Sequence, residues 1–390
     1  MQRSILTGLG LNPSSNPPEA RGGGRWKLYV VLIASLLFVL WLLRERWLGT
    51  GFEWQALAHS FLELNWPWLS GAIALALASY AVRALRWRIM IRPLRPGAHI
   101  WGLISATMIG FTAVTLVGRP GEIVRPYLIS RKENLPLSSQ LAAWFLERIW
   151  DLLAFVVMFG YALIHLGRSR VVLGARFEMA IQAGGYVIAA AGVICIVILI
   201  VLNRFSGIVK KRLLDALQFL PERHHERVDR FVTAFLDGAA ATKSGSTVSL
   251  LLLYTAAEWL VIVLSISLLF RAYPAAAAMN FADLVTFTAF VACGSLVQIP
   301  GIGGGVQIVS IVVLNELFRV PLELATSMAI MIWIISWIVV VPVGLGLAFR
   351  EGLNWRQLRT LEHKAVEEAQ AAAMPPEANR KKPAAGGSRA

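Results

Sequence analysis

The chain has 390 residues, of which 57% are hydrophobic and only 15% carry a charge. Ordinary soluble domains are about 25% charged, so the composition excludes a soluble enzyme, whose water-facing surface needs more charges. The 37 Lys and Arg residues against 23 Asp and Glu give a net charge of +14. Such an excess suits either a nucleic-acid partner or the cytoplasmic loops of a membrane protein, and the positions of the basic residues decide between them.

Apolar segments long enough to cross about 30 Å of hydrocarbon recur along the chain. A polar tail, residues 1–27, precedes the first segment, which we interpret as an uncleaved anchor because no small-residue cleavage site is visible. The predicted full spans are Leu28–Leu43, Trp66–Val82, Leu141–Leu166, Met179–Leu202, Val248–Phe270 and Ala325–Phe349. The final residues, 350–390, are rich in Ala, Pro, Lys and Glu and predict a cytoplasmic tail that fades into disorder.

Two further apolar regions, Ile100–Val117 and Phe281–Phe318, are interrupted by glycine and proline. The breaks contain Gly118, Pro120 and Gly121 in the first region and Pro300, Gly301 and Gly303 in the second. If each broken region returns to the side from which it entered, 29 of the 37 basic residues lie on one side and 7 on the other. The positive-inside rule therefore favours two re-entrant hairpins, with both termini on the cytoplasmic side.

An internal repeat supports this arrangement. A shift of 185 residues places Gly118 on Gly303, Glu122 on Gln307, and each span and broken region of one unit on its counterpart in the other. An extra span between the units, 179–202, inverts the second unit relative to the first. The sequence thus predicts an all-α, polytopic membrane protein with about six full spans and two re-entrant helical hairpins in an inverted repeat. Its membrane domain is 28–349, with repeat units at about 66–166 and 251–349 and a binding site where the breaks meet.

The connector 203–247 is polar and basic, with leucines at helical spacing at positions 213, 214, 217 and 220. This pattern is typical of an amphipathic helix held at the cytoplasmic surface by anionic headgroups. A solvated connector that obeys the positive-inside rule explains it equally well.

The first candidate site is the break around Gly118, which carries Arg119, Glu122 and Arg125. Irregular backbone at membrane depth survives only when it is buried in protein or lines a wet cavity. A helix that opens at such a break presents unpaired N–H groups, and its dipole favours anions. The two arginines then predict a binding site for a phosphate, and Glu122 would orient an arginine or carry a proton. The alternative is a basic interfacial loop.

The second candidate site is Glu147, Arg148 and Asp151, which lie several residues into a predicted span. Their spacing places them on neighbouring faces of one helix. Charged groups in a membrane are costly and usually face a bundle interior or an aqueous cavity, so we expect them to pair with Arg119, Arg125 or Glu122 across the cavity. A charge network that only joins helices is the alternative.

Further polar residues extend the predicted substrate-binding set. Arg83 and Arg86 close the second span, either as snorkelling anchors, as most such clusters are, or as headgroup contacts at the cavity mouth. In the second unit, Gln298, Gln307 and Glu258 are the polar groups near membrane depth. A buried glutamine can also simply bond a backbone carbonyl.

Signals for catalysis are absent from the sequence. There is no G-x-x-x-x-G-K-[ST] phosphate loop, no H-E-x-x-H pair and no G-x-S-x-G elbow. The two cysteines, Cys195 and Cys293, lie in apolar stretches and predict neither a disulfide framework nor a metal cluster. We therefore expect no enzyme activity, no cofactor and no metal.

Several motifs together resemble a flippase-like family named after the transmembrane region of lysylphosphatidylglycerol synthase. The matching pieces are the Arg83–Trp87 segment, the loop from Gly121 to Arg125, Glu147 with Arg148 and Asp151, and the Pro300–Gly303 break. The resemblance covers roughly residues 65–350 and implies membrane proteins that move or handle polar-headed lipids. This chain departs from the family pattern in its second unit, where Gln307 and Trp333 replace a glutamate and an arginine. We also expect no soluble aminoacyl-transferring domain like that of the synthase, because 41 residues follow the last predicted span.

These observations predict a flippase or lipid transporter in the cytoplasmic membrane that moves a polar-headed, phosphate-containing lipid through a charged cavity between the hairpins. The alternative is a non-catalytic accessory protein of a lipid or glycolipid biosynthetic pathway, partnered with a lipid-synthesising enzyme. Nucleic acid is not needed to explain the charge. Glycine-rich spans would also permit the close packing of protomers in a homo-oligomer.

Overall fold

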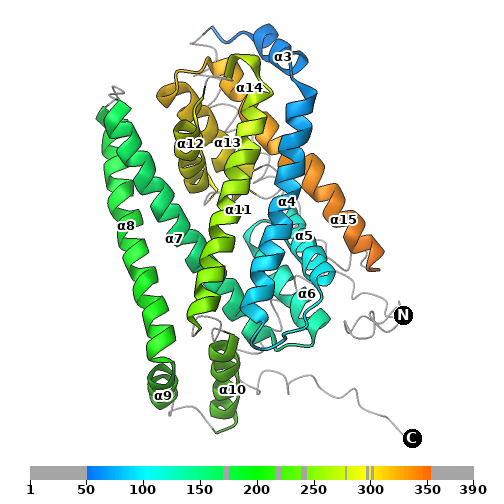
Figure 1. The fold of residues 1–390 in the computed structure, drawn as a ribbon, viewed down its shortest axis with the longest axis vertical. Coiled ribbons are helices and arrows are strands. Elements are labelled where there is room, and N and C mark those ends of the chain that lie inside the picture. Colours follow the sequence, from blue (N-terminus) through cyan, green and yellow to red (C-terminus); the bar gives the residue numbers. More distant parts are fainter. Residues whose placement is uncertain are drawn as a thin grey trace, which may run out of the picture.

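The computed structural model describes residues 51–169, 175–216, 222–238, 244–276, 279–295, 298–299 and 303–352 (Figure 1). The predicted anchor Leu28–Leu43 and both predicted tails lie outside these residues, apart from 350–352. Nearly all of the described chain is helical, as the sequence predicts for an all-α membrane protein.

Six segments of the described chain are long and apolar enough to cross a membrane, so this is a multi-pass membrane protein. They are Trp66–Ile91, Ile100–Val117, Leu137–Arg168, Gln182–Leu202, Gly245–Arg271 and Leu322–Arg350. Five of them coincide with predicted full spans. The remaining one, Ile100–Val117, is the first broken region, and it satisfies the length criterion for a span although the sequence predicts a re-entrant segment.

Two long antiparallel helices, α4 (Trp66–Ile91) and α11 (Gly245–Arg271), run side by side through the molecule (Figure 1). Small residues allow the close approach, since Ala72 of α4 is fully buried and its carbonyl accepts a hydrogen bond from the Ser265 hydroxyl at 2.8 Å. At one end, the backbone N–H of Asn65 donates to the carbonyl of Ala272 at 2.9 Å. In hydrocarbon, such small-residue packing and interhelical hydrogen bonds hold helices together.

The first broken region forms α5 (Ile100–Val117), a short 3-10 turn η1 (Arg119–Ile123) and α6 (Val124–Glu133). Gly118 ends α5 with a φ of 87°, a conformation that residues with a side chain rarely adopt. A Cβ added to Gly121 would lie 2.6 Å from the Ala113 carbonyl carbon. The predicted break is therefore where the chain reverses. Glycine is needed at Gly118 for the turn and at Gly121 for the close approach of the returning backbone to α5.

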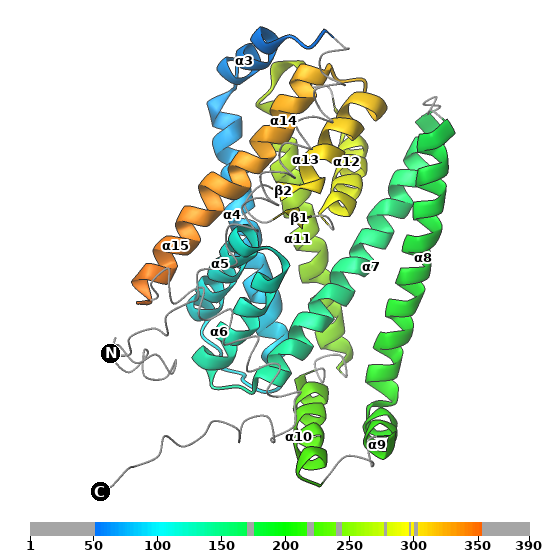
Figure 2. The ribbon, with the colours of Figure 1, turned by 180° about the vertical axis from the view of Figure 1, so that it is seen from behind.

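The second broken region forms α12 (Phe281–Gly294), a two-residue antiparallel pairing of β1 (Gln298–Ile299) with β2 (Gly303–Gly304), α13 (Gly305–Val312) and the π-helical turn η4 (Val313–Leu317). A Cβ on Gly294 would lie 2.5 Å from the Gly305 carbonyl oxygen, so glycine also allows this reversal. Figure 2 shows α5 and α6 in one half of the molecule, α12 and α13 in the other, and β1 and β2 between them.

The remaining helices surround these elements. The helix α7 (Leu137–Ser169) crosses the molecule obliquely and packs along α8 (Ala175–Arg204), while α14 (Leu322–Ile334) continues through the π-helical turn η5 (Ile335–Val340) into α15 (Val341–Arg350). A short helix, α3 (Trp54–Leu62), precedes α4.

The basic connector contains two helices, α9 (Ser206–Ala216) and α10 (Glu222–Gly238), where the sequence predicted one. Lys210 of α9 and Asp229 of α10 form an ion pair of 2.9 Å, and α10 packs against α7. The predicted apolar stripe is only partly described, since positions 217 and 220 lie outside the described residues.

Candidate functional site

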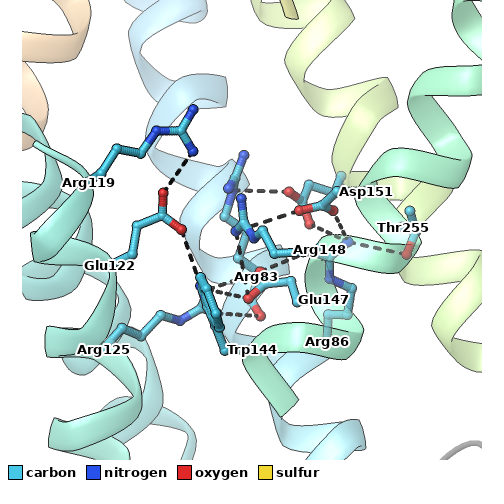
Figure 3. Close-up of polar contacts among 11 residues, drawn as sticks. Arg83, Arg86, Arg119, Glu122, Arg125, Trp144, Glu147, Arg148, Asp151 and Thr255 are labelled. Carbon is cyan, nitrogen blue, oxygen red and sulfur yellow. Dashed lines mark hydrogen bonds and ion pairs between the residues drawn. The ribbon is translucent and has the colours of Figure 1, made fainter. Parts of the chain in front are cut away.

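A buried arginine, Arg86 of α4, lies at the centre of a network of carboxylates (Figure 3). Its side chain is 0% exposed and its guanidinium lies 2.8 Å from Glu147, 2.6 Å from Asp151 and 3.2 Å from Glu258. It also donates to the Thr255 hydroxyl at 3.2 Å. Because α4 supplies the cation, α7 supplies two carboxylates and α11 supplies the third, this network joins three helices that are distant in sequence.

A second arginine, Arg125 of α6, connects the first broken region to the same network. One of its guanidinium nitrogens donates to both oxygens of Glu147, each at 2.9 Å, and another donates to the backbone carbonyl of Arg83 at 3.2 Å. Its guanidinium also lies 4.2 Å from the centre of the Trp87 ring. Arg125 is thus the one of the three expected partners that pairs with Glu147, and the pair is buried.

The close approach of α5 and α6 fixes the position of Arg125. A Cβ added to Gly110 of α5 would lie 2.5 Å from the Cβ of Arg125. We expect Gly110→Ala to destabilise the protein by about 1–3 kcal/mol, because overpacking forces the helices apart. Thermal unfolding in detergent measures this, and Gly160→Ala in α7, which meets nothing within 4 Å, is the matched control. Equal melting temperatures for the two variants would show that this contact is not tight.

The remaining charged side chains form the more open part of the site. Arg83 lies 3.0 Å from Glu258, and Arg148, which is 39% exposed, lies 3.6 Å from Asp151. At the break, Arg119 forms an ion pair of 3.1 Å with Glu122, which also accepts a hydrogen bond from the Trp144 indole at 3.2 Å. The predicted basic residues of the break and of α7 thus face one shared space (Figure 3).

One contact joins the two broken regions. The Arg119 guanidinium donates to the backbone carbonyl of Ser295, the residue that ends α12, at 3.3 Å. The turn of the first region therefore touches the end of the first helix of the second region. The sequence predicted a binding site where the two breaks meet, and of the second break Pro300 and Gly301 lie outside the described residues.

A cavity of about 410 Å³ lies between these elements, and we call it the charged cavity. Its charged lining residues are Arg83, Arg119, Glu122, Arg125, Arg148, Asp151 and Glu258. Glu147 and Arg86, both predicted as binding residues, lie behind its wall with side chains that are 0% exposed. In the structure they hold the lining residues in place and do not themselves face the cavity.

The charges of this site do not cancel. The network and the cavity wall contain five arginines (Arg83, Arg86, Arg119, Arg125 and Arg148) and four carboxylates (Glu122, Glu147, Asp151 and Glu258). With all of them ionised the set carries one excess positive charge. An anionic group of one negative charge entering the cavity would therefore neutralise it.

Of the residues predicted from the second unit, Glu258 lines the charged cavity, whereas the two glutamines do not. Gln307 accepts a hydrogen bond at 2.7 Å from the backbone N–H of Gly304, three residues earlier, and it is not among the residues that line the charged cavity. This parallels Glu122, which contacts Arg119 three residues earlier in the first unit. Gln298 and Gly303 pair with their neighbours in β1 and β2, whereas Pro300 and Gly301 lie outside the described residues.

The snorkelling interpretation is wrong for Arg86. Arg86 and Trp87 are both fully buried, and the Trp87 indole donates to Gln140 at 3.0 Å. An interfacial anchor would have its polar end in water. Here α7 and α11 cover this face of α4 with carboxylates instead.

Sequence reasoning named Glu258 only as a polar group near membrane depth, and it missed Trp144 and Trp259 as lining residues. A signal for Glu258 was available, since it is the single acidic residue of a 27-residue apolar helix and such residues are functional candidates by default. No comparable signal marks the tryptophans.

Within the described residues, no group of three or more His, Cys, Asp and Glu side chains could hold a metal ion.

Comparison with known proteins places these features in a family. The model of the lysylphosphatidylglycerol synthase transmembrane region matches residues 27–344. The chain belongs to this family. The match covers both broken regions, the charged network and the connector, so the resemblance seen in the sequence motifs is confirmed.

A more limited similarity links the chain to glycosyltransferase AglD of Haloferax volcanii, with 28% identity over 102 residues. The aligned segment is 26% of this chain and 16% of the length of that protein. No solved structure matches the chain.

Proposed function

We propose that this member of the lysylphosphatidylglycerol synthase transmembrane-region family is a lipid flippase or lipid transporter that moves a polar-headed, phosphate-containing lipid across the cytoplasmic membrane. The observation that carries the proposal is the charged cavity, which lies where the two broken regions meet and has one positive charge in excess. The family supports a lipid-related function in a membrane.

Arginine suits this role because its planar guanidinium binds phosphate oxygens through two parallel hydrogen bonds. Arg148 and Arg119 are the cations of the cavity with the greatest exposure, at 39% and 51%. We propose that these two contact the phosphate first. Asp151 and Glu122 orient them and also suit a cationic group elsewhere on the headgroup.

The two broken regions are the moving parts in this proposal. We propose that they act as re-entrant hairpins of an inverted repeat, each made rigid by glycine contacts at Gly121 and Gly294. The Arg119–Ser295 contact closes the path between them, and its release would open the cavity toward the other leaflet. The proposed mechanism contains no catalytic step and needs no cofactor.

The orientation follows from the positive-inside rule, with both termini on the cytoplasmic side. Helices α9 and α10 would then lie at the cytoplasmic surface, where the arginines and lysines of the connector face anionic headgroups.

Translocation in reconstituted vesicles tests the proposal. We expect the protein to move fluorescent phosphatidylglycerol between leaflets faster than protein-free vesicles do. Glu122→Ala should slow this movement about tenfold, because Arg119 loses the carboxylate that orients it, and one hydrogen bond to a charged group is about 1.5–3 kcal/mol. Glu63→Ala, at an exposed glutamate outside the cavity, is the matched control. Rates equal to those of empty vesicles would contradict the proposal.

The second candidate function is an accessory protein of a lipid or glycolipid biosynthetic pathway. The short similarity to a glycosyltransferase favours it. In that case the purified protein would move no labelled lipid but would co-purify with a lipid-synthesising enzyme in fixed proportion.

A further inference from the structure

A second hollow, which we call the apolar groove, lies beside the charged cavity between α7 and α11. It has a volume of about 360 Å³. Its walls include Trp150, Val157, Leu252, Ala256, Leu260 and Phe281. Four of these, Val157, Leu252, Leu260 and Phe281, are exposed and form the rim, so the groove opens on the surface that faces hydrocarbon.

The apolar groove adjoins the charged cavity through one side chain. Trp259 of α11 lines both hollows, and on α7 the cavity residue Asp151 lies directly beside the groove residue Trp150. Thr255, the polar residue of the groove wall, accepts a hydrogen bond from Arg86 of the charged network. A single layer of side chains therefore separates a site for an anion from a site for hydrocarbon.

Tryptophan prefers positions where a polar region meets an apolar one, because its ring is apolar and its indole N–H is polar. Trp259 holds such a position, since it lines the charged cavity as well as the apolar groove.

We propose that the apolar groove binds an acyl chain of the same phospholipid whose phosphate occupies the charged cavity, with Trp259 as the partition between headgroup and chain. This inference rests on the proposed function. The cavity of about 410 Å³ is too small for the chains of a diacyl lipid, and its wall carries seven charged side chains, so the chains must leave it for an apolar surface. The groove offers such a surface, because it shares the Trp259 side chain with the cavity and has an exposed apolar rim.

Photolabelling in vesicles tests the proposal directly. The probe is phosphatidylglycerol with a diazirine midway along one acyl chain, in phosphatidylcholine vesicles that contain the full chain. We expect adducts on Leu252 and Leu260 of the groove to exceed those on Leu253 and Leu264, which are exposed on the same helix but lie outside the groove. Unlabelled phosphatidylglycerol should compete, and Arg148→Ala should reduce groove labelling about tenfold through loss of a charged contact.

Translocation measured in the same vesicles separates the possible failures. Equal labelling of the two leucine pairs, with translocation that still depends on Arg148, would overturn the groove and leave the proposed function standing. Translocation by the wild-type protein no faster than in protein-free vesicles would overturn the proposed function, and the groove assignment with it.

A filled groove provides an independent readout. Ala256→Trp places a large ring inside the groove and should slow translocation about tenfold, whereas Leu253→Trp, on the exposed face of the same helix, should leave it unchanged. Equal rates for both variants, with wild-type melting temperatures, would overturn the proposal. If Ala256→Trp does not fold, the photolabelling comparison decides.

Discussion

Replacing Arg86 with alanine should destabilise the protein by about 3–5 kcal/mol, the range for removing one partner of a buried ion pair. The side chain is fully buried and lies within 3.2 Å of three carboxylates on two other helices. Without it, Glu147 retains Arg125, but Asp151 and Glu258 keep only their contacts with the more exposed Arg148 and Arg83.

Thermal unfolding in detergent measures this effect. Arg88→Ala is the matched control, because Arg88 is an exposed arginine two residues further along the same helix and should change stability by less than about 0.5 kcal/mol. Arg86→Lys should remain well below wild type, since one ammonium group cannot reproduce the fork that reaches three carboxylates. A wild-type melting temperature for Arg86→Ala would show that the network does not hold these helices together.

Replacing Arg148 with alanine should slow phosphatidylglycerol translocation about 10- to 100-fold while leaving the fold intact. Loss of a hydrogen bond to a charged group accounts for this range, at about 1.5–3 kcal/mol. Folding should survive because the side chain is 39% exposed and its partner Asp151 keeps the 2.6 Å contact with Arg86.

The contrast between the two arginines is itself informative. Arg86→Ala should lower the melting temperature strongly, whereas Arg148→Ala should lower the transport rate at an unchanged melting temperature. Vesicle assays with Arg148→Lys complete the comparison, because a lysine retains the charge but not the bidentate geometry, and it should recover part of the rate. If Arg148→Ala transports at the wild-type rate, Arg148 does not contact the substrate.

Much of the helical architecture could be predicted from hydropathy alone. Spans such as Trp66–Val82 and Val248–Phe270 lie within α4 and α11, because hydrocarbon requires about 20 apolar residues per crossing. The break at Gly118 is also where the chain reverses, since only glycine readily adopts its φ of 87°. Helix boundaries and the splitting of the connector into α9 and α10 were not predicted, because they depend on contacts with α7 and between the two helices.

The site was predicted less completely than the helices. Charged residues in apolar segments identified Glu147, Arg148 and Asp151. The cost of isolated charges predicted pairing with Arg119, Arg125 or Glu122, and the structure pairs Glu147 with Arg125. The buried position of Arg86 was harder to predict, because an arginine near the end of a span looks the same in sequence whether it reaches water or a buried carboxylate. The packing of α7 and α11 over α4 decides this, and one sequence does not reveal that packing.

A native thiol offers the most direct test of whether the lipid passes through the charged cavity. Cys293 lines that cavity, whereas Cys195 is 7% exposed on α8. In a Cys195→Ser protein, a sulfonate-bearing methanethiosulfonate reagent would attach an anion to Cys293, and Cys293→Ser is the insensitive control. We predict that modification stops phosphatidylglycerol translocation and that added phosphatidylglycerol slows the modification. Complete modification of Cys293, verified by mass, with an unchanged translocation rate would contradict the account.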